Sequence, residues 1–394
     1  MEKRFRSGNP SEDRYGCCTA LRAGERVFIS GLTGEAGGRV EAQFRGIMEA
    51  VERALRRFDA ALADAVRTRV FYTRPQDRGA LCAAHGEVFR AVRPAASLTE
   101  VHFLPGGAGV MVEVEAVRGS GKSRKVLDLD TPEAKEMGCA GAVRVGEEVW
   151  VAGVTAVGAD GAVVAPGDAA SQGREVVSRI LSLIEGCGAR AEDVVSTRTY
   201  TPVAYVSTDT GRQRLPLMHP GHPTAAGITV QGVGGRDAGI LIEAEAVAGA
   251  QEGRRNVNTG RSYEEEHHYS RSVRVRDGRG RRSGESSGAV VYVSGTTSVQ
   301  VGEAVACPFD AYGQTLATLR WVRWGVEQQG LSFRDVVRTR SYVVGEENVE
   351  GVARGLRETM GEFGPVATVV GVPALGRPSI LVEIEATAVR GAEG

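Results

Sequence analysis

Residues 111–119 read MVEVEAVRG, and the same pattern returns as LIEAEAVAG at 241–249 and as LVEIEATAVRG at 381–391. Apolar and polar residues alternate in each run, which is typical of a β-strand with one buried face. The first glutamates of the runs are separated by 130 residues and then by 140: Glu113, Glu243 and Glu383. A strand that returns at such intervals predicts repeated copies of one folding unit.

Two further signals occur in the same order in each copy. An apolar run that ends in a small residue and a glycine reads RVFISG, EVWVAG and VVYVSG, and it ends at Gly31, Gly153 and Gly295. A Thr-Arg dipeptide within a strand-like run reads VRTRVFYT, VSTRTYTP and VRTRSYVV, with Arg69, Arg198 and Arg340. An amphipathic helical pattern separates the two signals. We therefore expect an α+β fold of three β-β-α-β-α-β-β units, at residues 14–118, 136–248 and 267–390.

A sheet whose helices cover one side leaves its other side exposed, and three copies in one chain can bury these sides against each other. The sequence thus predicts an intramolecular pseudo-trimer, and whether it pairs with a second copy stays open. The third unit also carries an insertion, RVRDGRGRRSGESSG at 274–288. Its Arg, Gly and Ser content favours a solvated hairpin extension. The alternative is a loop that folds over a pocket and attracts an anion.

Composition excludes several classes of function. The formal net charge is −1, which argues against nucleic-acid or membrane-surface binding driven by charge. There is no apolar run long enough for a membrane span, and the first residues lack a signal peptide's apolar stretch. The six cysteines are scattered, without metal-ligand spacing, so we expect reduced thiols in a cytoplasmic protein and no bound metal. The glycine-rich stretches lack nucleotide-binding contexts, so we expect no cofactor.

The ordered motifs resemble the Rid (YjgF/RidA) superfamily, most closely in the first unit through VRTRVFYT, AAHGEVF, VRPAAS and MVEVEA. This resemblance implies a chorismate-mutase-like α+β fold, a trimeric arrangement and ligand clefts between neighbouring units. Family members that deaminate imines or enamines bind the substrate carboxylate with an arginine after a Pro-Ala step. The matching positions here are alanines, namely Ala96, Ala225 and Ala367. This departure favours chemistry other than standard deamination of a 2-aminoacrylate.

Other cleft positions follow from the same resemblance. The carboxylate that positions water matches Glu113, Glu243 and Glu383. A tyrosine near the start of a unit matches Tyr15 and Tyr269, but the second unit has Met137. A serine before the glycine matches Ser30 and Ser294, but the second unit has Ala152. We therefore expect the second unit to have lost its half of a cleft.

The third unit also resembles the C-terminal part of chorismatases, through HYSRSVRV, VYVSGTTSV and LVEIEA. That resemblance implies Glu383 as the acid and Arg271 as a ligand of a substrate carboxylate. A carboxyl group in a partly desolvated cleft has a raised pKa and can donate a proton near neutral pH. The three strand arginines Arg69, Arg198 and Arg340 could bind a substrate carboxylate or pair with glutamates, and the ion pair is favoured.

These patterns lead to one main hypothesis and several alternatives. The main hypothesis is a cofactor-free hydrolase or deaminase-like enzyme that acts on a small imine, enamine or enol in a dedicated biosynthetic step. Fusing three units allows one cleft to specialise, which a homotrimer cannot do. The alternatives are chorismatase-like hydrolysis of an enolpyruvyl ether and a non-catalytic small-molecule-binding or scaffold protein. Ribonuclease activity, which is sometimes assigned to this family, is disfavoured by the formal net charge of −1.

Overall fold

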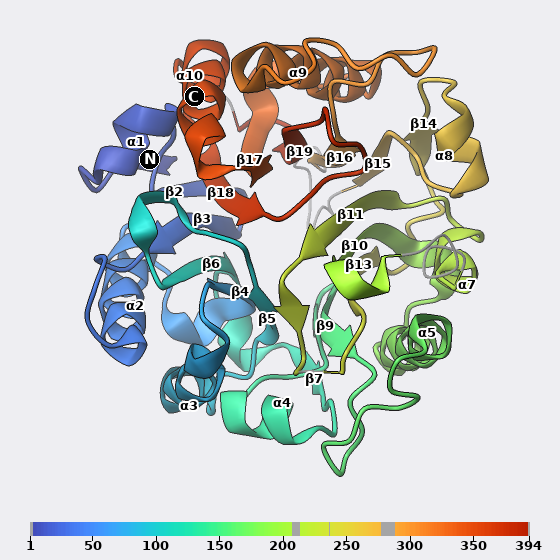
Figure 1. Ribbon diagram of the computed structural model, residues 1–394. Helices are drawn as coiled ribbons and strands as arrows, with labels where there is room; N and C mark the ends of the chain where they lie inside the picture. The colour runs from blue at the N-terminus through green and yellow to red at the C-terminus, as the bar shows by residue number, and fades with distance from the viewer. Residues whose placement is uncertain (1–2, 207–212, 236, 277–287, 393–394) are drawn as a thin grey trace.

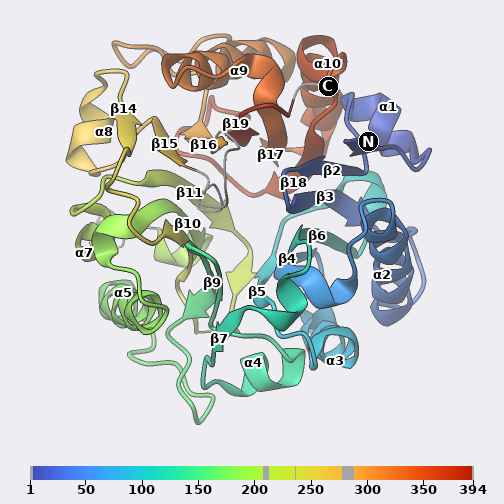
Figure 2. The same cartoon turned by 180° about the vertical axis from the view of Figure 1, so that it is seen from behind.

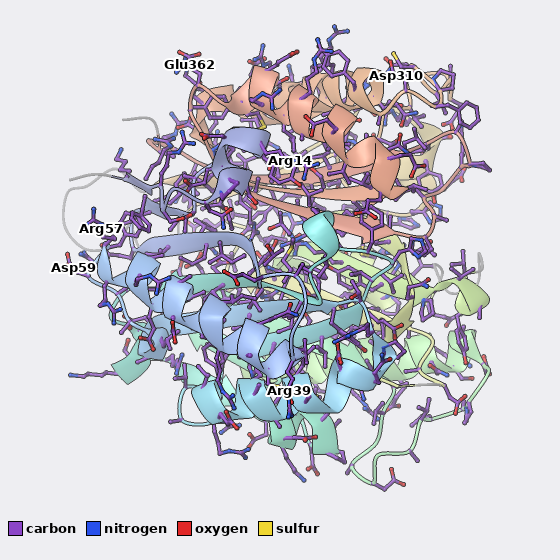
Figure 3. All side chains as sticks on the ribbon, turned by 60° about the vertical axis from the view of Figure 1, so that its left-hand side comes forward. Arg14, Arg39, Arg57, Asp59, Asp310 and Glu362 are labelled. Atoms are coloured by element: carbon purple, nitrogen blue, oxygen red, sulfur yellow. The ribbon has the colours of Figure 1, made fainter. Side chains whose placement is uncertain are left out.

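The computed structural model describes residues 3–206, 213–235, 237–276 and 288–392. Most of the expected insertion at 274–288 lies outside these residues. Three mixed β-sheets stand around a common centre, and the helices form an outer layer (Figure 1). Charged side chains such as Arg39 and Glu362 lie on this outer layer (Figure 3). The expected α+β fold of three repeated units is therefore confirmed.

The first sheet has seven strands. Their order is β1 (Arg4–Phe5), β2 (Ala20–Ala23), β3 (Arg26–Thr33), β6 (Val110–Val117), β4 (Ala65–Tyr72), β5 (Ala95–Glu100) and β12 (Gly232–Val233). The accompanying helices are α1 (Pro10–Tyr15), α2 (Val40–Arg56) and α3 (Arg78–Phe89). The apolar stripe of α2 packs on the sheet, with Phe44 and Val51 fully buried. Strand β12 comes from the second unit, so neighbouring units share this sheet.

The second and third sheets repeat this plan. The second runs β11 (Thr224–Val230), β10 (Val194–Pro202), β13 (Leu241–Val247), β9 (Glu148–Thr155), β8 (Ala142–Val145) and β7 (Lys125–Leu127), with helices α4 (Pro132–Met137), α5 (Ala169–Gly186) and α7 (Leu215–Met218). The third runs β14 (Arg255–Val257), β15 (Ser272–Arg276), β16 (Ala289–Thr296), β19 (Val382–Val389), β17 (Val336–Val344) and β18 (Val366–Val372), with helices α8 (Ser262–Glu266), α9 (Ala311–Gln328) and α10 (Val349–Met360). Helix α7 is a single turn, because Pro220 and Pro223 follow it closely.

Short 3-10 turns connect these elements. They are η1 (Leu62–Asp64), η2 (Pro75–Asp77), η3 (Pro105–Gly107), η4 (Ser120–Lys122), η5 (Ala191–Asp193), η6 (Val203–Tyr205), η7 (Phe333–Asp335) and η8 (Glu346–Asn348). In each sheet one strand pair is parallel, namely β4 with β5, β10 with β11, and β17 with β18. The helix between these two strands makes the crossover that a parallel pair requires.

The three units form a closed ring. Strand β5 contacts β9, β11 contacts β16, and β18 contacts β3. We call these contacts the 1–2, 2–3 and 3–1 seams. The same backbone hydrogen bond occurs at each seam: Ala140 N to Pro94 O at 3.0 Å, Ser270 N to Pro223 O at 3.0 Å, and Cys18 N to Pro365 O at 3.2 Å. Helix α1 packs on α10, so the first and third units meet (Figures 1 and 2). The expected intramolecular pseudo-trimer is confirmed.

The register of β19 corrects our alignment of the three glutamate runs. Arg69 pairs with Glu113 across the sheet and Arg198 pairs with Glu243, but Arg340 pairs with Glu385. The third run has two extra residues before its closing Val-Arg-Gly, and that closing end sets the register. Because side chains alternate with a period of two, a shift of two residues keeps both glutamates on the same face.

The shift gives Glu383 a different position from the one we expected. Glu383 lies opposite Tyr342, as Met111 lies opposite Phe71 and Leu241 lies opposite Tyr200. Phe71, Tyr200 and Tyr342 belong to one apolar cluster at the centre of the ring. Glu383 therefore replaces an apolar residue of the other two units and is not the counterpart of Glu113 or Glu243.

Candidate functional site

A buried network of ion pairs joins the inner faces of the three sheets. Each Thr-Arg arginine reaches a glutamate of the next unit through its Nε atom: Arg69 to Glu243 at 2.8 Å, Arg198 to Glu385 at 2.6 Å, and Arg340 to Glu113 at 2.9 Å. All six side chains are buried. The three arginines are thus held by protein carboxylates, and their position differs from that of a substrate ligand on a cavity wall.

These carboxylates have strongly lowered pKa values. Burial raises the pKa of Glu113, but Arg340 and Arg69 overcome this effect and bring the pKa to about 2. The pKa of Glu243 falls to about 2 through Arg69 and Arg67 in the same way. Glu113 and Glu243 are therefore ionised at neutral pH and cannot donate a proton. Their bonds to arginines differ from the water-positioning role that the family resemblance implied for them.

The network lacks one ion pair at the 2–3 seam. In the first unit Arg67 Nη1 lies 3.7 Å from Glu245 Oε1, and in the third unit Arg338 Nη1 lies 3.1 Å from Glu115 Oε2. The matching residue of the second unit is Ser196. Thr387 of the third unit stands where the other two units have Glu115 and Glu245. An arginine and a glutamate are thus replaced together, which leaves no buried charge without a partner.

Each seam encloses a cavity, and the three cavities differ in size and lining. The cavity at the 3–1 seam measures about 40 Å³ and is lined by Tyr15, Ser30 and Met111. The 1–2 cavity measures about 230 Å³, and Met137 lies on its wall. The 2–3 cavity measures about 240 Å³, and Glu383 lies on its wall. The 3–1 cavity has room for little more than water.

Glu383 is a protonated acid in the wall of the 2–3 cavity. It is 8% exposed and makes no hydrogen bond or ion pair with a residue that the structure describes. A Cβ atom built on Gly295 would lie 2.0 Å from Glu383 Oε1, so the carboxyl group lies directly against this glycine. Burial and the charge of Glu385 raise the pKa of Glu383 to about 8, against the opposing effect of Arg271. The carboxyl group is therefore mainly neutral at pH 7.

Arginines dominate the rest of the cavity wall. Arg271 donates to Glu264 at 3.0 Å, to the Tyr269 hydroxyl at 3.0 Å and to the Gly295 carbonyl at 3.0 Å. Three further arginines line the cavity, namely Arg214, Arg261 and Arg377. Glu303 also lies on the wall, where it pairs with Arg377. Because the positive charges exceed the negative ones, the cavity suits an anionic ligand.

The two candidate serines bond to the backbone across the seams. Ser294 Oγ donates to Ser270 O at 2.7 Å and accepts from Ala225 N at 2.9 Å. Ser30 Oγ donates to Cys18 O at 2.6 Å and accepts from Ala367 N at 3.1 Å. Both hydroxyl groups are therefore occupied by backbone groups.

The two candidate tyrosines lie in different cavities. Tyr269 lines the 2–3 cavity with Glu383 and Arg271, whereas Tyr15 lines the small 3–1 cavity. The structure thus brings together Glu383, Tyr269 and Arg271 of the expected set, and it separates them from Glu113, Tyr15 and Ser30. Sequence reasoning missed some residues of this wall, namely Arg214, Arg261, Tyr263, His267, Glu303 and Arg377. They lie outside the repeated motifs, Tyr263 in α8 and the others in turns and loops, so the repeat itself carried no signal for them.

The part of the chain that the structure describes contains no group of three His, Cys, Asp or Glu residues able to hold a metal ion. Three histidine rings gather outside the 2–3 cavity, with centroids 5.0 to 6.0 Å apart: His219, His222 and His268. None of the described helices is both long and apolar enough to cross a membrane. Cys17 and Cys18 are buried free thiols, as the sequence suggested.

Known proteins resemble parts of this chain or its whole fold. An uncharacterised protein of Streptomyces coelicolor is 34% identical over 125 residues, which cover 30% of this chain and 93% of that protein. A YjgF/YER057c/UK114 family protein from Mycobacterium tuberculosis is 33% identical and covers 34% of this chain and 98% of its own, with a TM-score of 0.29. A chorismatase crystal structure is 15% identical, covers 83% of this chain and 93% of its own, and has a TM-score of 0.55.

The chorismatase similarity concerns the fold, because the identity is low, and it extends over most of both chains. The family model described as endoribonuclease L-PSP matches residues 9–118 and 264–390, which is more than half of the chain. The second unit, whose cleft residues differ most, lies between the two matched regions. On this evidence the chain is a member of the endoribonuclease L-PSP (YjgF) family, built from three Rid-type units in tandem.

Proposed function

We propose that this chain is a cofactor-free hydrolase that protonates a small anionic enol ether, enamine or imine in the 2–3 cavity, with Glu383 as the general acid. Family membership and the chorismatase-like fold support a role in processing or binding small molecules. The observation that carries the finer proposal is the neutral carboxyl group of Glu383 in an arginine-lined cavity. A carboxylic acid with a pKa near the working pH is an efficient proton donor.

For an enolpyruvyl ether, the proposed reaction is hydrolysis by proton transfer and addition of water. Glu383 gives its proton to the methylene carbon, and the positive charge develops on the carbon that bears the ether oxygen. Water adds to this carbon and loses a proton, which restores Glu383. The resulting hemiketal breaks its bond to the alkoxy oxygen and releases an alcohol and pyruvate. For an enamine the same proton yields an iminium ion, and water then displaces the amine.

Arginines would hold the substrate during this reaction. Arg271 is fixed beside the carboxyl group of Glu383 by four hydrogen bonds to protein groups, so it presents a positive charge without reorganising. This charge opposes the rise in the pKa of Glu383 and would stabilise the carboxylate that remains after proton transfer. Tyr269, which bonds Arg271, would help to orient it.

The other two seams lack this acid. Met111 and Leu241 stand at the positions that correspond to Glu383. A chain in which one cavity contains such a buried neutral acid suits a dedicated biosynthetic step, because a single site can specialise while the others provide structure. We expect one active cavity in each chain.

Chorismatase-like hydrolysis is the second candidate within this chemistry. The similarity in fold spans most of the chain, and Arg271 and Glu383 both line the 2–3 cavity. A non-catalytic small-molecule-binding protein is the remaining alternative. A cavity of about 240 Å³ suits a small molecule better than a polynucleotide.

The experiment compares the wild type with Glu383→Gln and with Glu327→Gln, a control on the exposed face of α9. Chorismate and simple enamines are offered, and release of pyruvate or ammonia is followed. We expect Glu383→Gln to lose at least about 100-fold in rate, the usual contribution of a general acid, and Glu327→Gln to lose nothing. Equal rates for the wild type and Glu383→Gln would reject the assignment. Saturable binding without turnover would favour the binding protein.

A further inference from the structure

An ion pair at the rim of the 2–3 cavity has no part in the proton transfer described above. Glu303 and Arg377 both line this cavity. Arg377 Nη2 lies 2.6 Å from Glu303 Oε2, and Arg377 Nη1 lies 2.5 Å from the Glu303 carbonyl oxygen. The side chains are 43% exposed for Arg377 and 46% exposed for Glu303. The pair thus stands between the cavity and bulk solvent.

Glu303 adopts a backbone conformation that favours glycine. Its φ angle is 72°, whereas Gly161 of the second unit has a φ angle of 81°. The two positions correspond, because Gln300 N bonds to Ala304 O at 2.8 Å as Gly158 N bonds to Ala162 O at 2.7 Å. A side chain in this left-handed region costs energy that glycine avoids. The strain indicates that the third unit keeps Glu303 for its side chain.

We propose that Glu303 and Arg377 form a carboxylate-exchange latch, in which Arg377 binds a carboxylate of the substrate and Glu303 occupies Arg377 while the cavity is empty. This inference rests on the proposed function, because it requires an anionic substrate in the cavity of Glu383. The side chain of Glu303 and the substrate group that would replace it on Arg377 are both carboxylates. Exchange therefore replaces one ion pair with another, and water solvates the released carboxylate of Glu303, whose side chain is 46% exposed.

The surrounding contacts permit this exchange without a larger movement. Phe309 N bonds to Ser379 O at 3.3 Å, and Gln314 Nε2 bonds to Ser379 O at 2.6 Å. These bonds fasten the loop that carries Glu303 to the loop that carries Arg377, below the ion pair. Only the two side chains and the tip of the hairpin need to move. Glu303 should therefore control affinity and leave the chemical step unchanged.

The test measures binding of pyruvate by calorimetry, together with KM and kcat for chorismate. The variants are Glu303→Gln and Arg377→Gln. The control is Glu358→Gln, which breaks a comparable exposed pair on α10, Arg354 with Glu358 at 2.8 Å. We expect Glu303→Gln to bind pyruvate about two- to fivefold more tightly, since an exposed ion pair is a weak competitor. Arg377→Gln should bind about tenfold more weakly, and Glu358→Gln should match the wild type.

Where chorismate is turned over, Glu303→Gln should lower KM by the same factor and leave kcat unchanged. The latch is overturned if Glu303→Gln binds pyruvate as the wild type does, or if Arg377→Gln binds it as tightly. Turnover that depends on Glu383, with unchanged KM in both rim variants, would remove the latch and keep the proposed function. If pyruvate binding follows the expected pattern but no substrate is turned over, the latch is kept and the proposed function is rejected. A wild type that neither binds pyruvate nor turns over a substrate would reject both proposals.

Discussion

Glu243 and Glu383 are both buried glutamates on inner sheet faces, and their neighbours give them opposite properties. Arginines surround Glu243 and bring its pKa to about 2. No arginine bonds Glu383 among the residues described, and its pKa rises to about 8. The difference follows from the charges that each seam supplies, since burial alone raises the pKa of both groups.

Stability should depend on pH through Glu383. Its pKa is about 8 in the folded protein against an ordinary value of 4.5, so the folded state binds a proton that the unfolded state releases between these values. The contribution of Glu383 is fully present below pH 4.5 and is lost as the pH rises to about 8. Relative to Glu383→Gln, the free energy of unfolding should fall by up to about 1.4 kcal/mol per pH unit in this window. Urea unfolding between pH 4.5 and 9 measures this difference, and parallel curves for the two proteins would contradict it.

The same substitution at the two glutamates should have unequal costs. Glu243→Gln leaves Arg67 and Arg69 without their shared carboxylate, so we expect about 3–5 kcal/mol of destabilisation. Glu383→Gln replaces one neutral group by another at pH 5, so its cost there should be below about 1 kcal/mol. Urea midpoints at pH 5 compare the variants. A larger loss for Glu383→Gln would show that Glu383 is held by the network after all.

At the scale of elements, the antiparallel pairing of β16 with β19 sets the position of Glu383. Position 295 must be a glycine for Glu383 Oε1 to keep its place, because a Cβ atom on residue 295 would lie 2.0 Å from this oxygen. At the corresponding Gly31 and Gly153 the nearest side chains include Met111 and Leu241. The two-residue shift of β19 therefore exchanges an apolar contact for a carboxyl group that faces the cavity.

Gly295→Ala should displace Glu383 and lower the rate of proton transfer. Gly227 on β11 is a matched control, because it lines the same cavity and a Cβ atom there meets nothing within 4 Å. We expect Gly295→Ala to lose roughly 10- to 100-fold in kcat, in keeping with the cost of a small misplacement of a reacting group. Gly227→Ala should keep kcat within about twofold of the wild type, because its added methyl group displaces no reacting group. The prediction fails if both variants keep the wild-type kcat in the turnover assay.

At the scale of the whole molecule, fusion of the units allows the seams to differ. The network has cyclic symmetry for Arg69, Arg198 and Arg340, and it departs from symmetry at Ser196 and Thr387. A homotrimer would carry every substitution at all three seams. Here, among the three seams, the 2–3 seam combines the missing ion pair with the cavity that contains Glu383.

Restoring the missing pair tests this account of the network. Ser196→Arg alone should destabilise the protein by about 3 kcal/mol or more, because it buries a cation without a partner. Thr387→Glu in the same protein should recover most of this loss, since Arg67 with Glu245 and Arg338 with Glu115 show how such a pair is accommodated. A double-mutant cycle from denaturant unfolding gives the coupling energy. Strictly additive costs would show that Ser196 and Thr387 do not face each other.

The three-fold repeat, the order of strands and helices, the α+β class and the closed ring could all be predicted from the amino-acid sequence. These follow from local alternation, helical periodicity and the need to cover each sheet's second face. It also placed Glu383, Tyr269 and Arg271 in one candidate site. The sequence could not predict which glutamates pair with arginines, because ion pairs such as Arg69 with Glu243 join residues far apart in the chain.

The register of β19 also needed the tertiary structure, because two Glu-x-Glu motifs that look alike can pair one pleat apart. The shared Val-Arg-Gly ending held the clue, since aligning from that end places Glu385 with Glu113. The loops that supply Arg214, Arg261 and Arg377 have no periodic pattern, so their convergence on the cavity could not be read from the chain. Periodicity reports which face a residue occupies, and only packing reports which neighbour it meets there.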